Sequence, residues 1–179
     1  MRAEFAQALA VLARISEEMV RRGHPRPILV GGGALELYSA SAYVTGDFDL
    51  VADRQDVLEE VFRQFGFVRP SGAGQLLRGW IHPELSFGFE IVGDRLLDGF
   101  ADMDRLFLLD VGADGATRII GIEDLIADRM GQYASGAARE CLDQARQLRK
   151  LVHELDEDYM GRRISEETMG AYGLDALDD

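Results

Sequence analysis

The segment from residue 28 to residue 53 constrains the fold more than any other, because it joins a glycine turn to two closely spaced aspartates. An apolar run at residues 28–30 stops at Gly31, Gly32 and Gly33, and a helix-forming stretch follows. This order predicts a strand, a tight turn and a helix. Glycines there let the backbone approach a ligand closely, and the bare amides at a helix start attract phosphate.

The two aspartates, Asp47 and Asp49, stand one residue apart in a stretch that reads as a strand. Successive side chains of a strand point to opposite faces, so both carboxylates share one face while Phe48 and Leu50 face the core. Two carboxylates about 7 Å apart on one strand face repel each other unless a cation neutralises them. One or two Mg²⁺ ions with oxygen ligands would do so, which outlines a phosphoryl-transfer site.

The spacing of these motifs resembles the signature of the nucleotidyltransferase superfamily, the DNA polymerase β-like fold. In that superfamily a Gly-Gly or Gly-Ser pair precedes an Asp-x-Asp pair by about the interval found here. The later motifs are similar in order to those of small bacterial members related to abortive-infection, type IV toxin–antitoxin nucleotidyltransferases. The matching segments are residues 45–49, a helix around 56–65, Gly66-Phe67 and Glu123-Asp124-Leu125, together spanning residues 25–153.

The resemblance implies an enzyme that uses Mg²⁺ or Mn²⁺ and moves a nucleotidyl group from a nucleoside triphosphate to an acceptor hydroxyl. It implies that Asp47 and Asp49 are catalytic and hold the metal. It also implies a nucleotide site, made of Gly31, Gly32, Gly33 and Thr45.

The superfamily's third acidic residue lies on a later strand, where it serves as a base or as a third metal ligand. Glu90 is the candidate, because it stands between Phe89 and Ile91 in a stretch with strand-like alternation. Asp94 and Asp110 are the alternatives.

Some positions depart from the toxin pattern and leave a second function open. Gly46 stands where many of those toxins have a basic residue, and Arg129 stands where they usually have a lysine. Few basic side chains flank the motif, which favours a weakly active or inactive binding module, such as a toxin–antitoxin component with an antitoxin-like protein partner. The intact set of Asp47, Asp49 and Glu90 opposes that alternative, and an unrelated α/β binding protein is a third.

Apolar periodicity predicts an α/β (α+β) fold with a mixed sheet of five or six strands and flanking helices. Residues 75–82 and 85–92 should form one hairpin, and residues 106–111 and 117–120 a second. The predicted domains are residues 1–121, nucleotidyltransferase-like; residues 122–155, an antiparallel helical hairpin of helices 122–133 and 138–155; and residues 156–179, an acidic tail. The tail has room for one short helix docked on the body, and disorder or ordering against a partner are its alternatives.

The composition limits the kinds of partner that the protein is expected to bind. The chain of 179 residues has a formal net charge of −13, which argues against broad nucleic-acid binding. A protein or small-molecule acceptor is therefore favoured over tRNA. The C-terminal helix carries four basic residues that form either a local basic surface or a solvated helix face: Arg139, Arg146, Arg149 and Lys150.

The sequence contains no run of eighteen apolar residues and no signal-peptide pattern, which predicts a cytoplasmic protein without a membrane partner. The lone cysteine, Cys141, excludes an internal disulfide and a cysteine-based zinc cluster. It falls on an apolar helix face, so we expect a buried thiol. Trp80 is expected to anchor the core.

Overall fold

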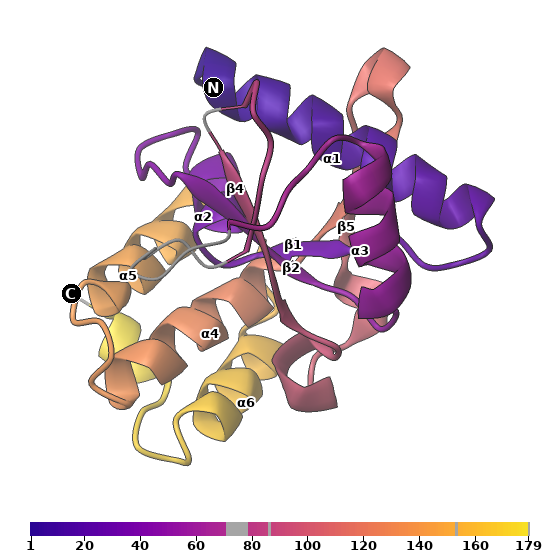
Figure 1. Cartoon of the computed structure of the whole chain (residues 1–179). Helices are drawn as coiled ribbons and strands as arrows, with labels where there is room; N and C mark the ends of the chain where they lie inside the picture. The colour runs from indigo at the N-terminus through magenta and orange to yellow at the C-terminus, as the bar shows by residue number, and fades with distance from the viewer. Residues whose placement is uncertain (71–78, 86, 153, 179) are drawn as a thin grey trace. The chain divides into compact units, whose positions relative to one another are not determined.

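The computed structural model describes residues 1–70, 79–85, 87–152 and 154–178. The chain divides into two compact units. Unit 1 consists of residues 1–96 and 106–119, and unit 2 consists of residues 97–105 and 120–179. Figure 1 shows the helices and strands of both units.

Unit 1 is built on a six-stranded mixed sheet with the strand order β3-β4-β2-β1-β6-β5. The pairs β1–β6 and β2–β4 are parallel, and the pairs β1–β2, β3–β4 and β5–β6 are antiparallel. The strands are β1 (Ile28–Val30), β2 (Asp47–Val51), β3 (Trp80–Ile81), β4 (Gly88–Gly93), β5 (Phe107–Asp110) and β6 (Ala116–Ile119). The mixed sheet confirms the predicted fold class.

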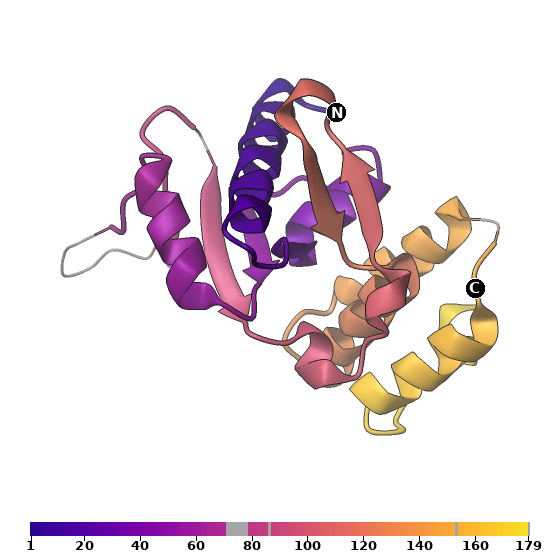
Figure 2. The same cartoon turned by 90° about the vertical axis from the view of Figure 1, so that its right-hand side faces the viewer.

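Both predicted hairpins correspond to antiparallel strand pairs. Trp80 pairs with Phe89 across β3 and β4, while residues 75–78 of the first predicted strand lie outside the described part of the chain. Phe107 pairs with Ile119 across β5 and β6, which Figure 2 shows as neighbouring arrows. A 3₁₀ turn, η3 (Gly112–Asp114), joins these two strands.

The described part of unit 1 contains the α-helices α1 (Ala3–Arg21), α2 (Gly31–Tyr38) and α3 (Gln55–Gln64). The apolar face of α1 meets the sheet through Phe5, whose ring lies 5.1 Å from the ring of Phe48. Phe62 of α3 reaches the same face, 6.0 Å from the ring of Phe89. Phe48 and Phe89 are fully buried, so this sheet face forms the core of unit 1.

The predicted turn between β1 and the following helix is shorter than expected. β1 ends at Val30, and Gly31 is already the first residue of α2. Gly31 has a φ of +57°, which lets the chain pass directly from strand to helix without a separate loop. The three glycines are therefore the first turn of the helix.

Unit 2 consists mainly of α4 (Ile122–Ala134), α5 (Cys141–Leu151) and α6 (Glu157–Glu167), with α4 packed against both of the others. Short 3₁₀ turns lie at Met103–Arg105 (η2) and Leu174–Leu177 (η4), and a further turn at Leu96–Gly99 (η1) leads into the unit. The prediction that the second helix continues to residue 155 was wrong. α5 ends at Leu151 because Val152 is extended. No helix among the described residues is long and apolar enough to cross a membrane.

Candidate functional site

Asp47, Asp49 and Glu90 share one face of the sheet in unit 1. Phe48 and Leu50 are fully buried, whereas Asp47 is exposed and Asp49 is half-buried. The parallel register pairs Asp49 with Glu90 and Phe48 with Phe89, whose rings lie 5.3 Å apart. Directly paired residues have side chains on the same face, so Glu90 lies on the same side as Asp49. The structure thus places the three predicted carboxylates on neighbouring strands.

Each glycine at the start of α2 faces a different group. A Cβ on Gly31 would collide with the Oδ2 atom of Asp49, so the absence of a side chain lets that carboxylate lie against the helix start. A Cβ on Gly32 would lie 2.9 Å from Oγ1 of Thr45, whereas one on Gly33 would strike the Phe48 ring. Gly31 and Gly32 thus border the site, and Gly33 serves the packing of the core.

The first turn of α2 carries backbone amides of the kind that attract anions. The first amides of a helix have no carbonyl partner within the helix, and they carry the positive end of its dipole. Val30 precedes this helix, and its apolar side chain cannot cap these amides. Asp49 lies beside the same turn, so a phosphate bound there would meet a negative charge unless a cation stood between them.

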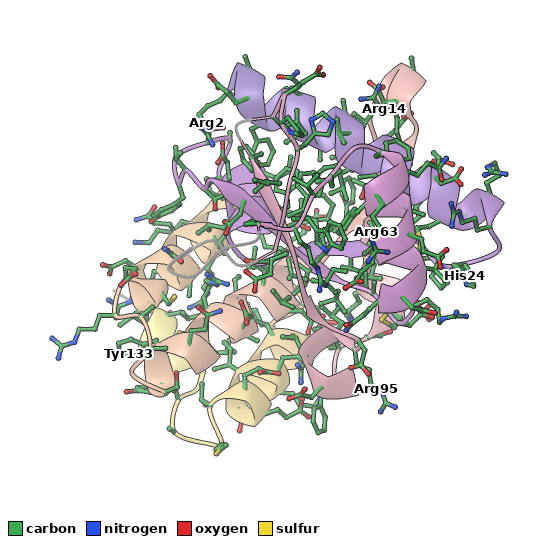
Figure 3. The ribbon with its side chains drawn as sticks, viewed as in Figure 1. Arg2, Arg14, His24, Arg63, Arg95 and Tyr133 are labelled. Carbon is green, nitrogen blue, oxygen red and sulfur yellow. The ribbon has the colours of Figure 1, made fainter. Side chains whose placement is uncertain are left out.

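Thr45 connects the loop before β2 to the first aspartate. Its hydroxyl Oγ1 donates a hydrogen bond of 2.9 Å to Oδ1 of Asp47. Its backbone N–H donates to Oε2 of Glu36 over 2.8 Å, and its carbonyl accepts a bond of 2.7 Å from Arg2. Arg2 lies at the N-terminal end of α1 (Figure 3). Backbone and side chain of Thr45 are both fixed.

Sequence reasoning missed Glu36 and Arg2. Glu36 is buried, and Arg2 donates to both of its carboxylate oxygens over 2.8 Å. Burial alone would raise the pKa of Glu36, but the hydrogen bonds from Arg2, Thr45 and Ser41 outweigh it and lower this pKa. The signal in the sequence was a single charged residue within the otherwise uncharged stretch that forms α2.

The donor set suits a hard cation held partly by a substrate. Within the described ranges, no three His, Cys, Asp or Glu side chains form a group that could hold a metal ion by themselves. Mg²⁺ is commonly bound through one or two carboxylates together with substrate phosphates and water. Asp47 and Asp49 supply two carboxylates on one strand face, which fits that mode of binding.

The alternatives to Glu90 lie elsewhere in unit 1. Asp94 follows the end of β4, and Asp110 lies on β5 at the far edge of the sheet, three strands from β2. The Asp110 carboxylate accepts a hydrogen bond of 2.8 Å from the Gly112 amide. Glu90 also borders a hollow of about 350 Å³ whose wall includes Arg69 and Trp80.

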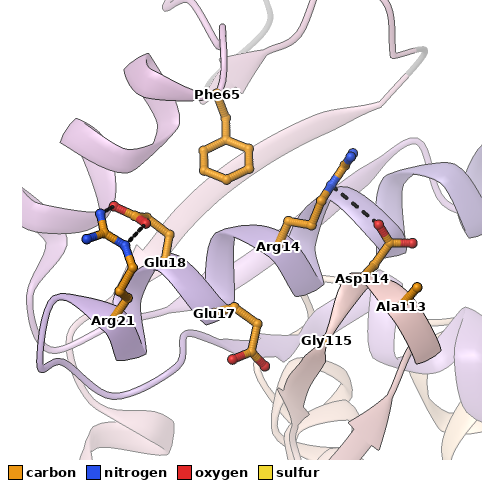
Figure 4. Close-up of a pocket in the computed structure, with 8 residues that line it drawn as sticks. All are labelled: Arg14, Glu17, Glu18, Arg21, Phe65, Ala113, Asp114 and Gly115. Carbon is orange, nitrogen blue, oxygen red and sulfur yellow. Dashed lines mark hydrogen bonds and ion pairs between the residues drawn. The ribbon is translucent and has the colours of Figure 1, made fainter.

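A second hollow in unit 1, of about 320 Å³, is lined by α1, by Phe65 just after α3, and by the turn between β5 and β6 (Figure 4). Its arginines are paired with carboxylates, because Arg21 lies 2.6 Å from Glu18 and Arg14 lies 3.6 Å from Asp114. None of the predicted site residues lines it. The charges in this hollow are largely neutralised within the protein.

Residues of the later motifs are engaged inside unit 2. Asp124 of the Glu-Asp-Leu motif is buried and accepts hydrogen bonds of 2.9 Å from Arg163 and 2.8 Å from Tyr159. Arg129 is also buried and lies 2.6 Å from Asp128. These residues stabilise the packing of the helices.

Two of the four basic residues near α5 hold the C-terminal segment. Arg146 donates to the carbonyl of Ala176 over 3.0 Å. Arg149 donates to Asp178 over 2.6 Å and to Glu157 over 3.0 Å. The two carboxylates paired with Arg149 reduce the basic charge that the helix could offer to a polyanion.

Comparison with known proteins identifies the fold. No family model matches the sequence, and no curated protein matches it. The crystal structure of an antigenic nucleotidyltransferase-like protein from Paracoccidioides brasiliensis is similar with a TM-score of 0.60 and 16% identity, over 97% of this chain and 92% of that chain. The solution structure of the antibiotic-resistance factor ANT(2'')-Ia is similar with a TM-score of 0.51 and 14% identity, over 91% of this chain and 90% of that chain. The chain has a nucleotidyltransferase-like fold, as the motif order predicted.

Proposed function

We propose that the chain is a nucleotidyltransferase that uses Mg²⁺ or Mn²⁺ and moves a nucleotidyl group from a nucleoside triphosphate to an acceptor hydroxyl. The observation that carries the proposal is the register that sets Asp49 beside Glu90, with Asp47 on the same strand face. Of these carboxylates, Asp49 adjoins a helix start at which Gly31 leaves room for it. Cation and phosphate binding can therefore occur in one place.

The phosphates of the triphosphate bind at the first turn of α2 in this proposal. The amides of Gly32 and Gly33 donate to the phosphate oxygens, and the Thr45 hydroxyl lies next to Gly32 at the edge of the same site. Asp47 and Asp49 would hold the cation, and the cation would supply charge neutralisation for the phosphates.

Glu90 removes the proton from the acceptor hydroxyl. The acceptor oxygen forms a bond to the α-phosphorus, the bond between that phosphorus and the oxygen bridging to the β-phosphate breaks, and pyrophosphate leaves. Positioning and charge neutralisation supply most of the catalysis. We favour a protein or a small-molecule acceptor, because the net charge of −13 repels a polyanion.

The proposal predicts metal-dependent stabilisation and transfer. Mg²⁺ or Mn²⁺ should raise the Tm of the wild type, and Asp49→Asn should abolish most of that rise, since the metal binds the folded state through this carboxylate. Transfer from an α-labelled triphosphate to RNA, protein or small-molecule pools should fall on the order of a hundredfold or more in Asp47→Ala.

Asp94→Asn is the matched control, because Asp94 is an exposed carboxylate just beyond β4. It should retain both the metal response and the transfer. Equal responses of the wild type and Asp49→Asn to metal would refute the site assignment.

A catalytically inactive binding module, such as a toxin–antitoxin component with an antitoxin-like protein partner, is the second candidate. Arg2, which contacts the loop before β2, is already engaged by Glu36 and by the Thr45 carbonyl. That pairing favours the second candidate, because it reduces what Arg2 can offer to a triphosphate. Metal-dependent triphosphate binding without label transfer to any acceptor pool would support it.

A further inference from the structure

Glu36 is the charged residue of α2, and its side chain is fully buried. Its carboxylate accepts hydrogen bonds from Arg2 at both oxygens, from the Thr45 amide over 2.8 Å and from the Ser41 hydroxyl over 3.1 Å. A buried carboxylate is costly unless it is paired and hydrogen-bonded. Glu36 meets both conditions, and all three of its partners lie outside α2.

The loop between α2 and β2 is shaped around this carboxylate. Ala40 and Ser41 both adopt left-handed backbone conformations, with φ values of 50° and 68°, which are unfavourable for residues other than glycine. The Ser41 amide donates to the Glu36 carbonyl over 2.8 Å, and the Ser41 hydroxyl donates to the Glu36 side chain. Strained backbone of this kind persists only where its surroundings determine it fully.

The far end of the loop delivers Thr45 to Asp47. Glu36 fixes the Thr45 amide, Arg2 fixes its carbonyl, and the hydroxyl is left to donate to Asp47 Oδ1 over 2.9 Å. Asp47 is exposed at the first position of β2, where packing against the core does not orient it. Its orientation therefore depends on Thr45.

Stability alone is a poor reason for this arrangement, because well-packed apolar residues often replace a buried ion pair at no loss of stability. We infer that Glu36 and Arg2 are positioning residues, which orient the metal-binding carboxylate of Asp47 through Thr45. The inference rests on the proposed function, since it takes Asp47 to be a metal ligand. Groups that orient metal ligands commonly contribute 10- to 100-fold to metal affinity.

Unit 1 also contains a control with the same hydrogen-bond pattern at a more exposed carboxylate, Glu17. Glu17 accepts from Arg26 over 2.8 Å and from the Ala116 amide over 2.9 Å, and Arg26 donates to the Ala116 carbonyl over 3.2 Å. Glu17, Arg26 and Ala116 thus repeat the roles of Glu36, Arg2 and Thr45, but they fix the start of β6. The three site carboxylates lie on β2 and β4, not on β6.

The experiment titrates Mn²⁺ into the folded protein of 179 residues. Calorimetry measures the affinity, and thermal unfolding measures the Tm with and without metal. Glu36→Gln and Thr45→Val should each weaken Mn²⁺ affinity by about tenfold or more. Glu17→Gln should leave it within about twofold of the wild type, because distant sites act independently. Thr45→Val removes only the hydroxyl contact to Asp47. It therefore tests whether Thr45 orients Asp47 even if Glu36→Gln lowers the Tm severely.

The outcomes separate this inference from the proposed function. Loss of Mn²⁺ binding in Asp49→Asn with unchanged affinity in Thr45→Val and Glu36→Gln would overturn the inference and leave the proposed function standing. A wild type that binds no Mn²⁺, alone or with a triphosphate, would overturn both. A lower Tm in Glu36→Gln with unchanged Mn²⁺ affinity of the folded protein would mean that Glu36 is only structural.

Discussion

Gly31 and Gly23 both have left-handed backbones, with φ values of +57° and +82°, but they differ in their surroundings. A Cβ on Gly23 would meet nothing within 4 Å among the described residues, whereas one on Gly31 would collide with Asp49. The requirement for glycine at position 31 therefore comes from both conformation and space.

Gly31→Ala should lower the stability of the protein and also reduce the rise in Tm that Mg²⁺ produces. Both Gly31→Ala and Gly23→Ala should lower the free energy of unfolding by about 1–3 kcal/mol through backbone strain. Only Gly31→Ala displaces the Asp49 carboxylate, so only it should lose most of the rise in Tm produced by Mg²⁺. Thermal unfolding with and without Mg²⁺ measures both effects, and an equal metal response in the two variants would show that Asp49 tolerates the added methyl group.

The sequence alone could predict which residues of β2 face the core, but it could not predict the contacts that orient Asp47. Two-residue alternation predicted that Phe48 and Leu50 face the core, and both are fully buried. Alternation cannot reveal that Glu36 binds Arg2, which lies 34 residues away along the chain. Contacts between distant residues depend on the tertiary fold, and hydrophobic periodicity carries no information about them.

Among the elements, strands and hairpins were easier to predict than boundaries. The β5–β6 hairpin follows from local alternation around a glycine turn. The pairing of Asp49 with Glu90 does not, because β2 and β4 are parallel neighbours joined by a long connection, and many registers are compatible with the pattern. The end of α5 was also missed, since apolar spacing continues to residue 155 although the helix stops at Leu151.

A buried ion pair, Asp124 with Arg163, joins α4 to α6. Burial disfavours a charged guanidinium, but hydrogen bonds to Asp124, Glu166 and Glu167 outweigh it and raise the pKa of Arg163 above its ordinary value. Arg163 thus keeps its charge throughout the physiological pH range.

Removing one member of this pair should destabilise unit 2 strongly. Asp124→Ala leaves the Arg163 charge buried with fewer partners, and we expect a loss of about 3–5 kcal/mol in the free energy of unfolding. Arg149→Ala breaks contacts to two exposed carboxylates, Glu157 and Asp178, and should cost only about 0.2–1 kcal/mol per pair. Urea unfolding, monitored by circular dichroism, compares the two variants. Similar losses in the free energy of unfolding would mean that the buried pair contributes no more than the exposed pairs.

At the scale of the whole molecule, charge is the main guide to the acceptor. The net charge is −13, and Arg146 and Arg149, two of the basic residues near the C-terminus, are used within the protein. Binding to bulk RNA depends largely on basic groups that displace counterions from phosphates.

The isolated protein should therefore bind bulk tRNA weakly, with a Kd above roughly 10 μM at physiological salt. Fluorescence anisotropy with labelled tRNA over a series of salt concentrations measures this. Tight binding, together with label transfer confined to tRNA and dependent on Asp47, would reverse the preference for a protein or small-molecule acceptor.

During synthesis on the ribosome, β1 lacks one of its two neighbouring strands until most of the chain has been made. β1 is added at residues 28–30, but its parallel partner β6 is not complete until residue 119. Until then a nascent chain can pair β1 with β2 and set Asp49 against Gly31, yet the other edge of β1 stays open. An open apolar edge invites pairing with other chains. Newly made protein should therefore need protection from aggregation until the last strand of its sheet has emerged.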